Sequence, residues 1–517
     1  MPTRVARYQW WTLALVLGCA ALTTPPRVDY VDGEVRLAVT RALVQGRIDV
    51  PLEAGAPYLT PEGRGGARYG IYAVGQSLLL VPLELTGRLL TAPLTSSEPR
   101  RLLLTNAWVA LSYALLINAA LGVVVFQLLR RLGCAARSAA QGTVVCYLAS
   151  PWVVWGRSLQ EESLAALLLL GALWLGLALP RSDRPLRGAL VAGLLLGFLA
   201  NVRYNAVFGA GAVALVVLAR VPAPAPRWRA ALALGAGAAP GLALALLYNA
   251  LRFGSPLETG YQAHALERDL AWRLQPERVA SILGGLDYGL LWLSAPLLLL
   301  PALLWRGGSP QARTVRMLTA LAASALAIQV IYLSGHWLPP SGQVGYSGSR
   351  YLAHSLILLA PATWIAWRQL AATRPRWARL GACAFLLGGA CQMLALPLTD
   401  RLEGLQDTVV LNTGATRRYP APLLPRRVVN LTRMLAGDLA ERSLPLEPEL
   451  RGRVDPVLME GLQVAARPNF LPWRVAAGSR SRDLPRALQL GLGAVWGLVG
   501  LSVLVVAWRW WRLVSSA

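Results

Sequence analysis

Long apolar stretches alternate with short arginine-containing segments along almost the whole chain. Many of these stretches run for roughly 17–25 residues, the length that an α-helix needs to cross a hydrocarbon core of about 30 Å. A helix satisfies its own backbone hydrogen bonds inside lipid, so the pattern predicts an all-α, polytopic membrane protein of about 12 transmembrane helices. The predicted spans are residues 9–24, 104–129, 138–156, 163–180, 188–202, 204–219, 230–250, 288–305, 317–335, 351–367, 380–398 and 487–508.

One further apolar stretch, Tyr69–Leu90, could cross the membrane or lie in its interface. The distribution of arginine favours the interface. If Tyr69–Leu90 does not cross, every short loop on the inner side is rich in arginine, as the positive-inside rule expects. If it crosses, all later loops are inverted and the rule fails almost throughout. We therefore expect an interfacial helix within the first outer loop.

This topology divides the chain into three parts. Residues 1–398 form a transmembrane region with a long first outer loop at residues 25–101. Residues 399–486 form a small extracytoplasmic subdomain rich in proline and arginine, and residues 487–517 supply a final transmembrane helix with a basic cytoplasmic tail. The basic N-terminus and its apolar run resemble a signal peptide, but with so many spans following we expect an uncleaved first span.

Composition adds two exclusions. Hydrophobic residues make up 55% of the 517 residues, charged residues make up 15%, and the net charge is +24. All basic residues are arginine and they fall in short loops, not in one stripe, so we expect no nucleic-acid partner. The five cysteines lie in or beside apolar stretches, which predicts no disulfide framework.

Charged side chains are nearly absent from the predicted spans, and His354 is the main titratable exception. Buried acids mark the pathways of ion-coupled transporters, so their scarcity disfavours transport. The three histidines lack metal-ligand spacing, and we expect neither a metal nor a cofactor. The charges gather instead at the outer ends of the spans, at Asp29, Asp32, Glu34, Arg157, Glu161, Glu162, Arg203, Arg252, Glu258, Asp287 and Arg350.

The stretch VDGEVRLAVTRALVQGRIDV, residues 31–50, places Asp32 and Glu34 at the predicted start of an amphipathic helix. An acid there can simply cap the helix and favour its positive end. It can equally serve as a general base, because a carboxylate held at a helix start is well positioned to accept a proton. The residues leave both roles open, and they leave open which acid would be the base.

Arg157 and Arg203 lie at the outer ends of predicted spans, and Glu161 and Glu162 follow Arg157 closely. Each arginine could anchor its helix at the membrane interface, which is an ordinary role. Each could also bind a lipid-linked phosphate, because a guanidinium group matches phosphate geometry. The spacing does not separate the two roles.

Several motifs resemble the GT-C superfamily of membrane glycosyltransferases. The nearest branch contains the protein O-mannosyltransferases and the bacterial transferase that adds aminoarabinose to lipid A. Residues 31–50 resemble that family's first-loop acidic motif, and GGARYGIYAVGQSLLLVPLEL resembles its interfacial segment. YNALRFGSPLETGY and GSRYLAHSLILLAP resemble two later loop-to-span motifs, so the likeness covers roughly residues 1–370.

The resemblance implies inverting transfer of a sugar from a polyprenyl-phosphate donor to a hydroxyl acceptor of a lipid, glycan or protein. The implied location is the extracytoplasmic face of a bacterial inner membrane, with membrane lipids as further partners. The implied general base is Asp32 or Glu34, and the lipid phosphate is assigned to arginine. The implied substrate-binding residues are Arg157, Glu161, Glu162, Arg203, Tyr261, Arg350 and Tyr351.

Two departures limit the resemblance. Gly33 separates Asp32 from Glu34 where the family often has adjacent acids, and the His-Pro-Pro-Leu element of the eukaryotic mannosyltransferases is absent. A protein acceptor is therefore not supported. The rival classes are a lipid or lipid-linked-saccharide flippase and a non-catalytic membrane assembly protein. A flippase needs a polar path that these spans lack, and an assembly protein gives no reason for acids and arginines to gather at one face.

Overall fold

The structure is a computed structural model of the chain. It describes residues 4–25, 28, 31–51, 59–222, 227–261, 275–286, 289–304, 310–336, 347–397, 400–413, 422–436, 462, 470 and 486–515. The described residues form helices and turns, and their β-structure is limited to one isolated bridge between Glu62 and Arg68. The predicted all-α class is confirmed.

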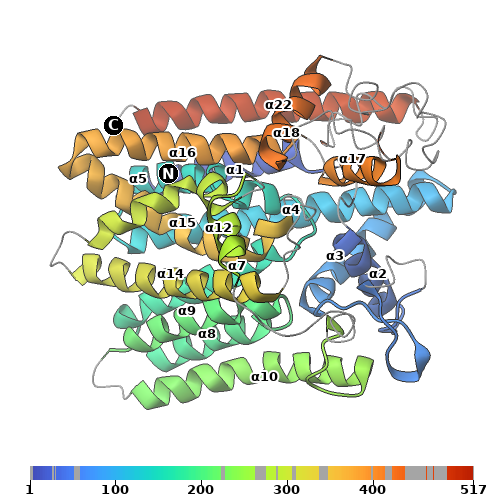
Figure 1. Ribbon diagram of the computed structural model, residues 1–517, viewed down its shortest axis with the longest axis horizontal. Coiled ribbons are helices and arrows are strands. Elements are labelled where there is room, and N and C mark those ends of the chain that lie inside the picture. The colour runs from blue at the N-terminus through green and yellow to red at the C-terminus, as the bar shows by residue number, and fades with distance from the viewer. Residues whose placement is uncertain are drawn as a thin grey trace.

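The long helices lie side by side, and α2 and α3 gather at one end of them (Figure 1). The α-helices are α1 Arg4–Thr23, α2 Val31–Val44, α3 Gly75–Thr91, α4 Glu98–Arg131, α5 Ala136–Leu148, α6 Trp152–Trp155, α7 Glu162–Ala178, α8 Pro185–Leu199, α9 Val207–Ala219, α10 Arg227–Phe253, α12 Pro276–Gly284, α13 Leu290–Leu293, α14 Pro310–His336, α15 Ser347–Thr373, α16 Pro375–Ala395, α17 Asp400–Thr413, α18 Leu423–Leu435 and α22 Arg486–Ser515. The 3-10 segments are η2 Arg64–Gly66, η3 Ala92–Leu94, η4 Leu179–Arg181, η5 Tyr204–Ala206 and η6 Ala295–Leu304.

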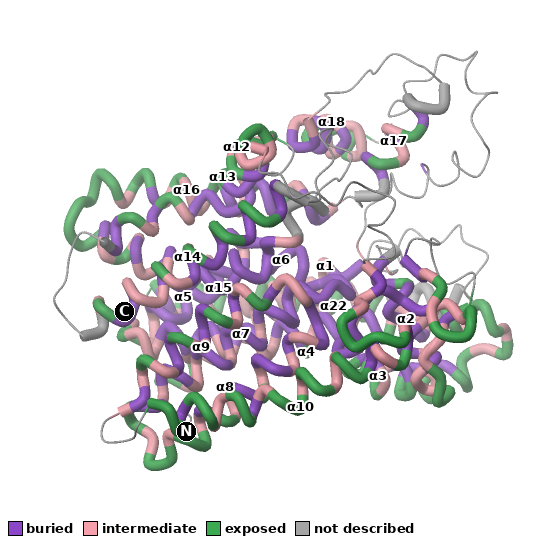
Figure 2. The backbone as a smooth tube through the Cα atoms, turned by 60° about the horizontal axis from the view of Figure 1, so that its bottom comes forward, coloured by how far each residue is buried: buried purple, intermediate pink, exposed green. Residues whose placement is uncertain are grey.

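The apolar core runs through the middle of this bundle. Figure 2 shows buried residues concentrated along α4, α7 and α15, with exposed residues on the peripheral α10 and α16. Among the described residues, seven helical segments are long and apolar enough to cross a membrane, and α8 and α9 are shorter apolar helices. Leucines are exposed on the peripheral helices, as expected for the lipid-facing surface of a polytopic membrane protein.

Two predicted spans do not form continuous α-helices. The predicted span at residues 138–156 is divided into α5 and α6, with Pro151 directly before α6. Residues 288–305 are predicted to cross as a single helix, but the described part contains the short α13 followed by the 3-10 segment η6. Pro296 and Pro301 lie within η6. A proline lacks the backbone N–H and clashes with the preceding turn, so the α-helical ladder is interrupted at these positions.

Glycine allows α8 and α10 to pack closely. A Cβ atom on Gly193 would collide with the carbonyl oxygen of Leu234, and one on Gly237 would collide with the carbonyl oxygen of Leu190. Small residues let helix backbones approach in this way inside membranes. The GAGAAPG segment, residues 235–241, is therefore a helix-packing surface.

The helix α3 packs beside the beginning of α4. The hydroxyl groups of Thr91 and Thr105 lie 3.0 Å apart, and the Trp108 indole donates to Thr86 at 3.1 Å. With 34 residues, α4 is about 51 Å long, well beyond the roughly 30 Å of a hydrocarbon core. The N-terminal end of α4, which contacts α3, can therefore extend beyond the hydrocarbon core of a membrane.

The described part of residues 399–486 contains a helical hairpin, α17 and α18. Arg427 forms a two-pronged ion pair with Glu403, with N···O distances of 3.0 and 2.8 Å, and both side chains are buried. The hairpin docks on the end of α16, because Arg427 also donates to the Ala395 carbonyl oxygen at 3.4 Å. The division of the chain at residue 398 stays a prediction.

Candidate functional site

The acidic motif forms the first turn of α2. The helix begins at Val31, so Asp32 lies inside the first turn and not at the cap position that the sequence suggested. Acids at the start and Arg41 near the end match the polarity of the helix dipole. Asp32 is only 8% exposed, whereas Glu34 faces outward and is exposed.

Gly33 brings this turn close to the segment before α7. A Cβ atom at Gly33 would lie 2.6 Å from the Val28 side chain, 3.5 Å from Leu159 Cβ and 3.8 Å from the Leu159 carbonyl oxygen. A larger residue at position 33 would therefore collide with Val28, which explains why glycine separates the two acids. Gly33 lets the Asp32 turn approach the loop that carries Arg157, Glu161 and Glu162.

One turn after Asp32, Arg36 connects α2 to that loop. Its guanidinium group forms an ion pair with Glu161 and donates to the Gln160 side-chain oxygen at 3.1 Å. The same group lies over the Tyr72 ring, with Cζ 4.0 Å from the ring centroid. Arg36 is 2% exposed, so these contacts replace its hydration.

Arg203 joins the same glutamates from the turn between α8 and α9. Its Nη1 atom lies 2.6 Å from Glu161 Oε1 and 2.8 Å from Glu162 Oε1. All three side chains are buried. Arg36, Glu161, Glu162 and Arg203 therefore form one ion cluster, which we call the buried ion cluster.

Aromatic side chains border the cluster. Arg203 Cζ lies 5.2 Å from the centroid of the Tyr351 ring, and the rings of Tyr204 and Tyr261 meet edge to face at 6.2 Å. Burial raises the pKa of Tyr261, and the nearby Tyr351 and Asp32 raise it further against the opposing charges of the two arginines. The Tyr261 phenol is therefore a neutral hydrogen-bond donor at ordinary pH.

The balance of charge changes the role expected for Arg203. Two carboxylates already compensate its charge, and with Arg36 the cluster holds two positive and two negative groups. Asp32 adds a further acid beside it. A phosphate would gain little from an arginine that is neutralised in this way. The structure thus gives Arg203 a structural ion-pair role that the sequence did not separate from phosphate binding.

Arg157 is held against the first helix. Its Nη1 atom donates to the Thr23 carbonyl oxygen, near the end of α1, at 2.6 Å, and Cζ lies 5.9 Å from the Phe470 ring centroid. The side chain is buried, beside the loop that carries Glu161 and Glu162. Arg350 lies in the first turn of α15, but its side chain lies outside the described residues.

The structure thus brings together Asp32, Glu161, Glu162, Arg203, Tyr261 and Tyr351, and it leaves Glu34 at the surface. Sequence reasoning missed Arg36, Gln160 and Tyr72. The available signal for Arg36 was its position four residues after Asp32, which puts both on one side of a helix. Nothing in the sequence distinguished Gln160 or Tyr72 from other loop residues.

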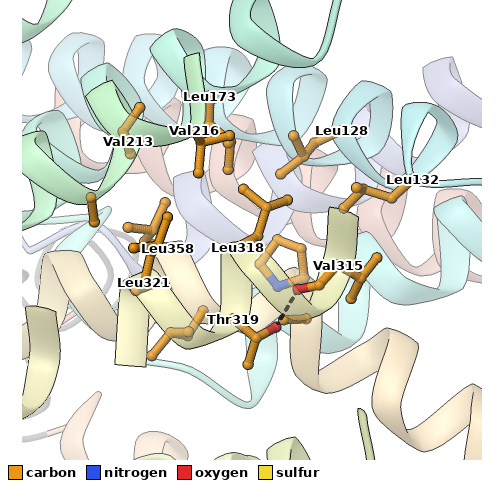
Figure 3. Close-up of a pocket in the computed structure, with 15 residues that line it drawn as sticks. Leu128, Leu132, Leu173, Val213, Val216, Val315, Leu318, Thr319, Leu321 and Leu358 are labelled. Atoms are coloured by element: carbon orange, nitrogen blue, oxygen red, sulfur yellow. Dashed lines mark hydrogen bonds between the residues drawn. The ribbon is translucent and has the colours of Figure 1, made fainter. Parts of the chain in front are cut away.

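A separate hollow lies between α4, α7, α9, α14 and α15 (Figure 3). Leucine, valine and alanine predominate in its lining, and the Thr319 hydroxyl is engaged with the Val315 carbonyl oxygen of its own helix at 2.8 Å. None of its lining residues is ionisable. The hollow therefore has no group for acid–base chemistry, and the candidate site is the buried ion cluster with Asp32.

Within the described residues, no group of three or more histidine, cysteine, aspartate or glutamate side chains is arranged to hold a metal ion. The glutamates of the cluster are occupied by arginine. The candidate chemistry of this part of the chain is therefore that of an acid, aromatic hydroxyl groups and guanidinium groups.

No protein-family model matches the chain, and no curated protein matches it. Solved structures that are similar to it in fold include the following two. ArnT from Cupriavidus metallidurans bound to undecaprenyl phosphate is 13% identical, with 95% of this chain and 76% of that chain covered and a TM-score of 0.45. The Archaeoglobus fulgidus oligosaccharyltransferase AglB, in complex with an inhibitory peptide and a dolichol-phosphate, is 13% identical, with 82% and 61% covered and a TM-score of 0.41.

Both proteins are members of the GT-C superfamily, the group that the motifs of residues 1–370 resemble.

Proposed function

We propose that this protein is a membrane glycosyltransferase. It moves a sugar from a polyprenyl-phosphate donor to a hydroxyl acceptor on the extracytoplasmic face, with inversion at the anomeric carbon. One observation carries the proposal: the acid Asp32 lies beside a buried ion cluster assembled from α2, the loop before α7 and the turn before α9. Burying so many charges is costly, and such clusters gather at functional sites.

The proposed step is a single displacement. The acceptor oxygen attacks the anomeric carbon while the bond from that carbon to the phosphate oxygen breaks. Asp32 accepts the hydroxyl proton as general base, and the polyprenyl phosphate leaves with the bonding electron pair. Asp32 suits this role better than Glu34, because Asp32 is held in a buried turn and Glu34 faces outward.

The buried ion cluster holds the base in place. Arg36 follows Asp32 by one helical turn and is bound to Glu161, so α2 cannot turn about its axis without breaking a buried ion pair. A fixed base and a fixed acceptor geometry can supply a large part of a catalytic barrier reduction. Tyr261, kept protonated by burial and by neighbouring groups, is available to donate to a sugar oxygen.

We assign the departing lipid phosphate to Arg350 and Arg157. Developing negative charge on a leaving group is stabilised by positive groups placed there in advance. Arg203 is a poor candidate because its charge is already compensated by two glutamates. A polyprenyl phosphate is itself a good leaving group, and its tail favours a site at the membrane edge.

The test is a transfer assay with the purified full-length protein in lipid nanodiscs. Undecaprenyl-phosphate-linked sugars are supplied as donors with a panel of lipid, glycan and peptide hydroxyl acceptors, and the anomeric configuration of the product is determined by NMR. We expect transfer with an inverted configuration. Absence of transfer from every donor by a folded protein, or a retained configuration, contradicts the proposal.

A further inference from the structure

A second polar group lies inside the helices close to the buried ion cluster. Gln329 is in α14, His354 and Ser355 are in α15, and Asn205 is in the η5 turn. Gln329, His354 and Ser355 are almost completely buried, and the helices around them are largely apolar. Buried polar groups in such surroundings need hydrogen-bond partners, so their contacts are informative.

The hydrogen bonds fix the orientation of the Gln329 amide. Its nitrogen donates to the Asn205 carbonyl oxygen at 3.0 Å, and a carbonyl oxygen can only accept. The amide oxygen therefore faces the other way, where it accepts from the Ser355 hydroxyl at 2.8 Å. A reversed amide would place two acceptors face to face.

The same amide fixes the tautomer of His354. The second hydrogen on the Gln329 nitrogen points to His354 Nε2, which lies 3.0 Å away. Nε2 must accept this hydrogen bond, so the neutral ring carries its proton on Nδ1. The Nδ1 atom is buried without a hydrogen-bond partner among the described residues. An unpartnered buried donor is unfavourable, so stability alone does not explain this histidine.

These hydrogen bonds hold the turn that carries Arg203. Gln329 holds the backbone of Asn205, two residues after Arg203, and the Asn205 side chain donates to the Tyr351 carbonyl oxygen at 3.1 Å. The turn is thus tied to α14 and to α15. The Tyr351 ring lies over Arg203, so one polar group fixes both the backbone and the aromatic neighbour of this arginine.

We propose that Gln329 is a positioning residue that acts through Asn205 on Arg203, with His354 Nε2 holding the Gln329 amide in its working orientation. This inference rests on the proposed glycosyl transfer, because Arg203 holds the glutamates beside Asp32. Misplacing a catalytic group by about 1 Å can cost about 100-fold in rate, so removal of the Gln329 amide should lower kcat/KM.

The test combines Gln329→Met with Arg203→Lys in a double-mutant cycle. Gln329→Met keeps the length of the side chain and removes its hydrogen bonds. We expect a loss of about 10–100-fold in kcat/KM in the wild-type background and a much smaller further loss in the Arg203→Lys background. Equal losses in the two backgrounds, or no loss from Gln329→Met, overturn the inference.

Gln392→Met is the matched control. Gln392 is a buried glutamine in α16 that donates to a backbone carbonyl oxygen, that of Leu293, at 2.7 Å. We expect this variant to keep its kcat/KM even if its thermal stability falls. A comparable loss of kcat/KM in Gln392→Met would mean that any buried glutamine gives the effect, and the inference would fail.

Two substitutions of His354 test the tautomer argument. Glutamine can place its amide oxygen near the position of Nε2, whereas asparagine is too short and matches Nδ1 instead. We expect His354→Gln to keep most of the wild-type kcat/KM and His354→Asn to lose as much as Gln329→Met. The reverse order contradicts a role through Nε2. Absence of turnover in the wild-type protein would instead reject the proposed glycosyl transfer itself.

Discussion

Arg36 is a charged side chain on the buried side of α2, one helical turn after Asp32. Val35, Leu37 and Val39 around it are buried, and Arg36 is itself almost fully enclosed. Its charge is balanced by Glu161, and its flat face rests on Tyr72. Removing Arg36 leaves two buried carboxylates with the single guanidinium group of Arg203, so one negative charge is uncompensated and the protein should lose stability.

The first prediction concerns this pair. Arg36→Met should lower the free energy of unfolding by about 3–5 kcal/mol, the usual cost of breaking a buried ion pair from one side. Thermal unfolding in detergent measures the change. The exposed pair of Arg47 and Asp49 offers a control, and Arg47→Met should leave the unfolding temperature unchanged. If both variants unfold like wild type, the cluster around Glu161 is not a stabilising centre.

The second prediction concerns the donor phosphate. Arg350→Lys should raise the KM for a polyprenyl-phosphate-linked sugar, because lysine cannot form the two-pronged contact that a guanidinium group forms with phosphate. Isotherms of undecaprenyl phosphate binding to the folded variant measure the same effect without turnover. Full donor affinity in Arg350→Ala would move the role to Arg157, the other arginine proposed for this phosphate.

At the scale of elements, α3 carries two different faces. Leu78, Leu85 and Leu89 are exposed, whereas Glu84 is buried and accepts from Arg88 at 2.9 Å and from Arg41 at 3.1 Å. An apolar outer face over a charged inner face is typical of a helix at a membrane surface. By length and composition alone the segment Gly75–Leu94 could also cross.

The third prediction separates these two topologies. A reporter enzyme fused after Leu90 should be extracytoplasmic, and one fused after Arg131 should be cytoplasmic, because α3 packs beside the part of α4 that a membrane need not enclose. Accessibility of single cysteines at the same positions provides an independent measurement. A cytoplasmic reporter after Leu90 together with an external one after Arg131 would invert the whole arrangement.

Most elements could be predicted from the sequence, because apolar length and arginine placement are local signals. The helices α4, α10 and α14 follow directly from them. The span at 288–305 was wrong because hydrophobicity outweighed Pro296 and Pro301, which interrupt an α-helix. The cap role considered for Asp32 was wrong, because α2 begins at Val31 and Asp32 lies two residues past the cap position, within the usual uncertainty of helix ends.

At the scale of the whole molecule, the site arises from residues far apart in the chain. Arg36, Glu161 and Arg203 come from three different segments, and their pairing depends on how α2 docks against the bundle. The sequence indicated that charged residues gather at the outer ends of the spans. This signal was enough to identify Glu161, Glu162 and Arg203 as candidate site residues. It could not show that Arg203 is neutralised by its partners, because the pairing is set by three-dimensional packing.

The central claim is that Asp32 is the base of a sugar transfer carried out at the buried ion cluster. Asparagine has nearly the size of aspartate but cannot accept the proton. In the first turn of α2 its loss of charge costs at most about 2 kcal/mol of helix-dipole stabilisation, the upper value for a partly buried charge. Turnover of an undecaprenyl-phosphate-linked sugar is therefore measured for wild type, Asp32→Asn and Glu34→Gln, with thermal unfolding of each.

We expect Asp32→Asn to fold and to lose about 10²–10⁴-fold in kcat, the usual contribution of a general base, while Glu34→Gln stays close to wild type. Near-normal turnover by Asp32→Asn would contradict the account and leave Asp32 with a structural role at the start of α2. If Asp32→Asn is active and Glu34→Gln is inactive, the base is the exposed acid, and the buried ion cluster is not the centre of the reaction.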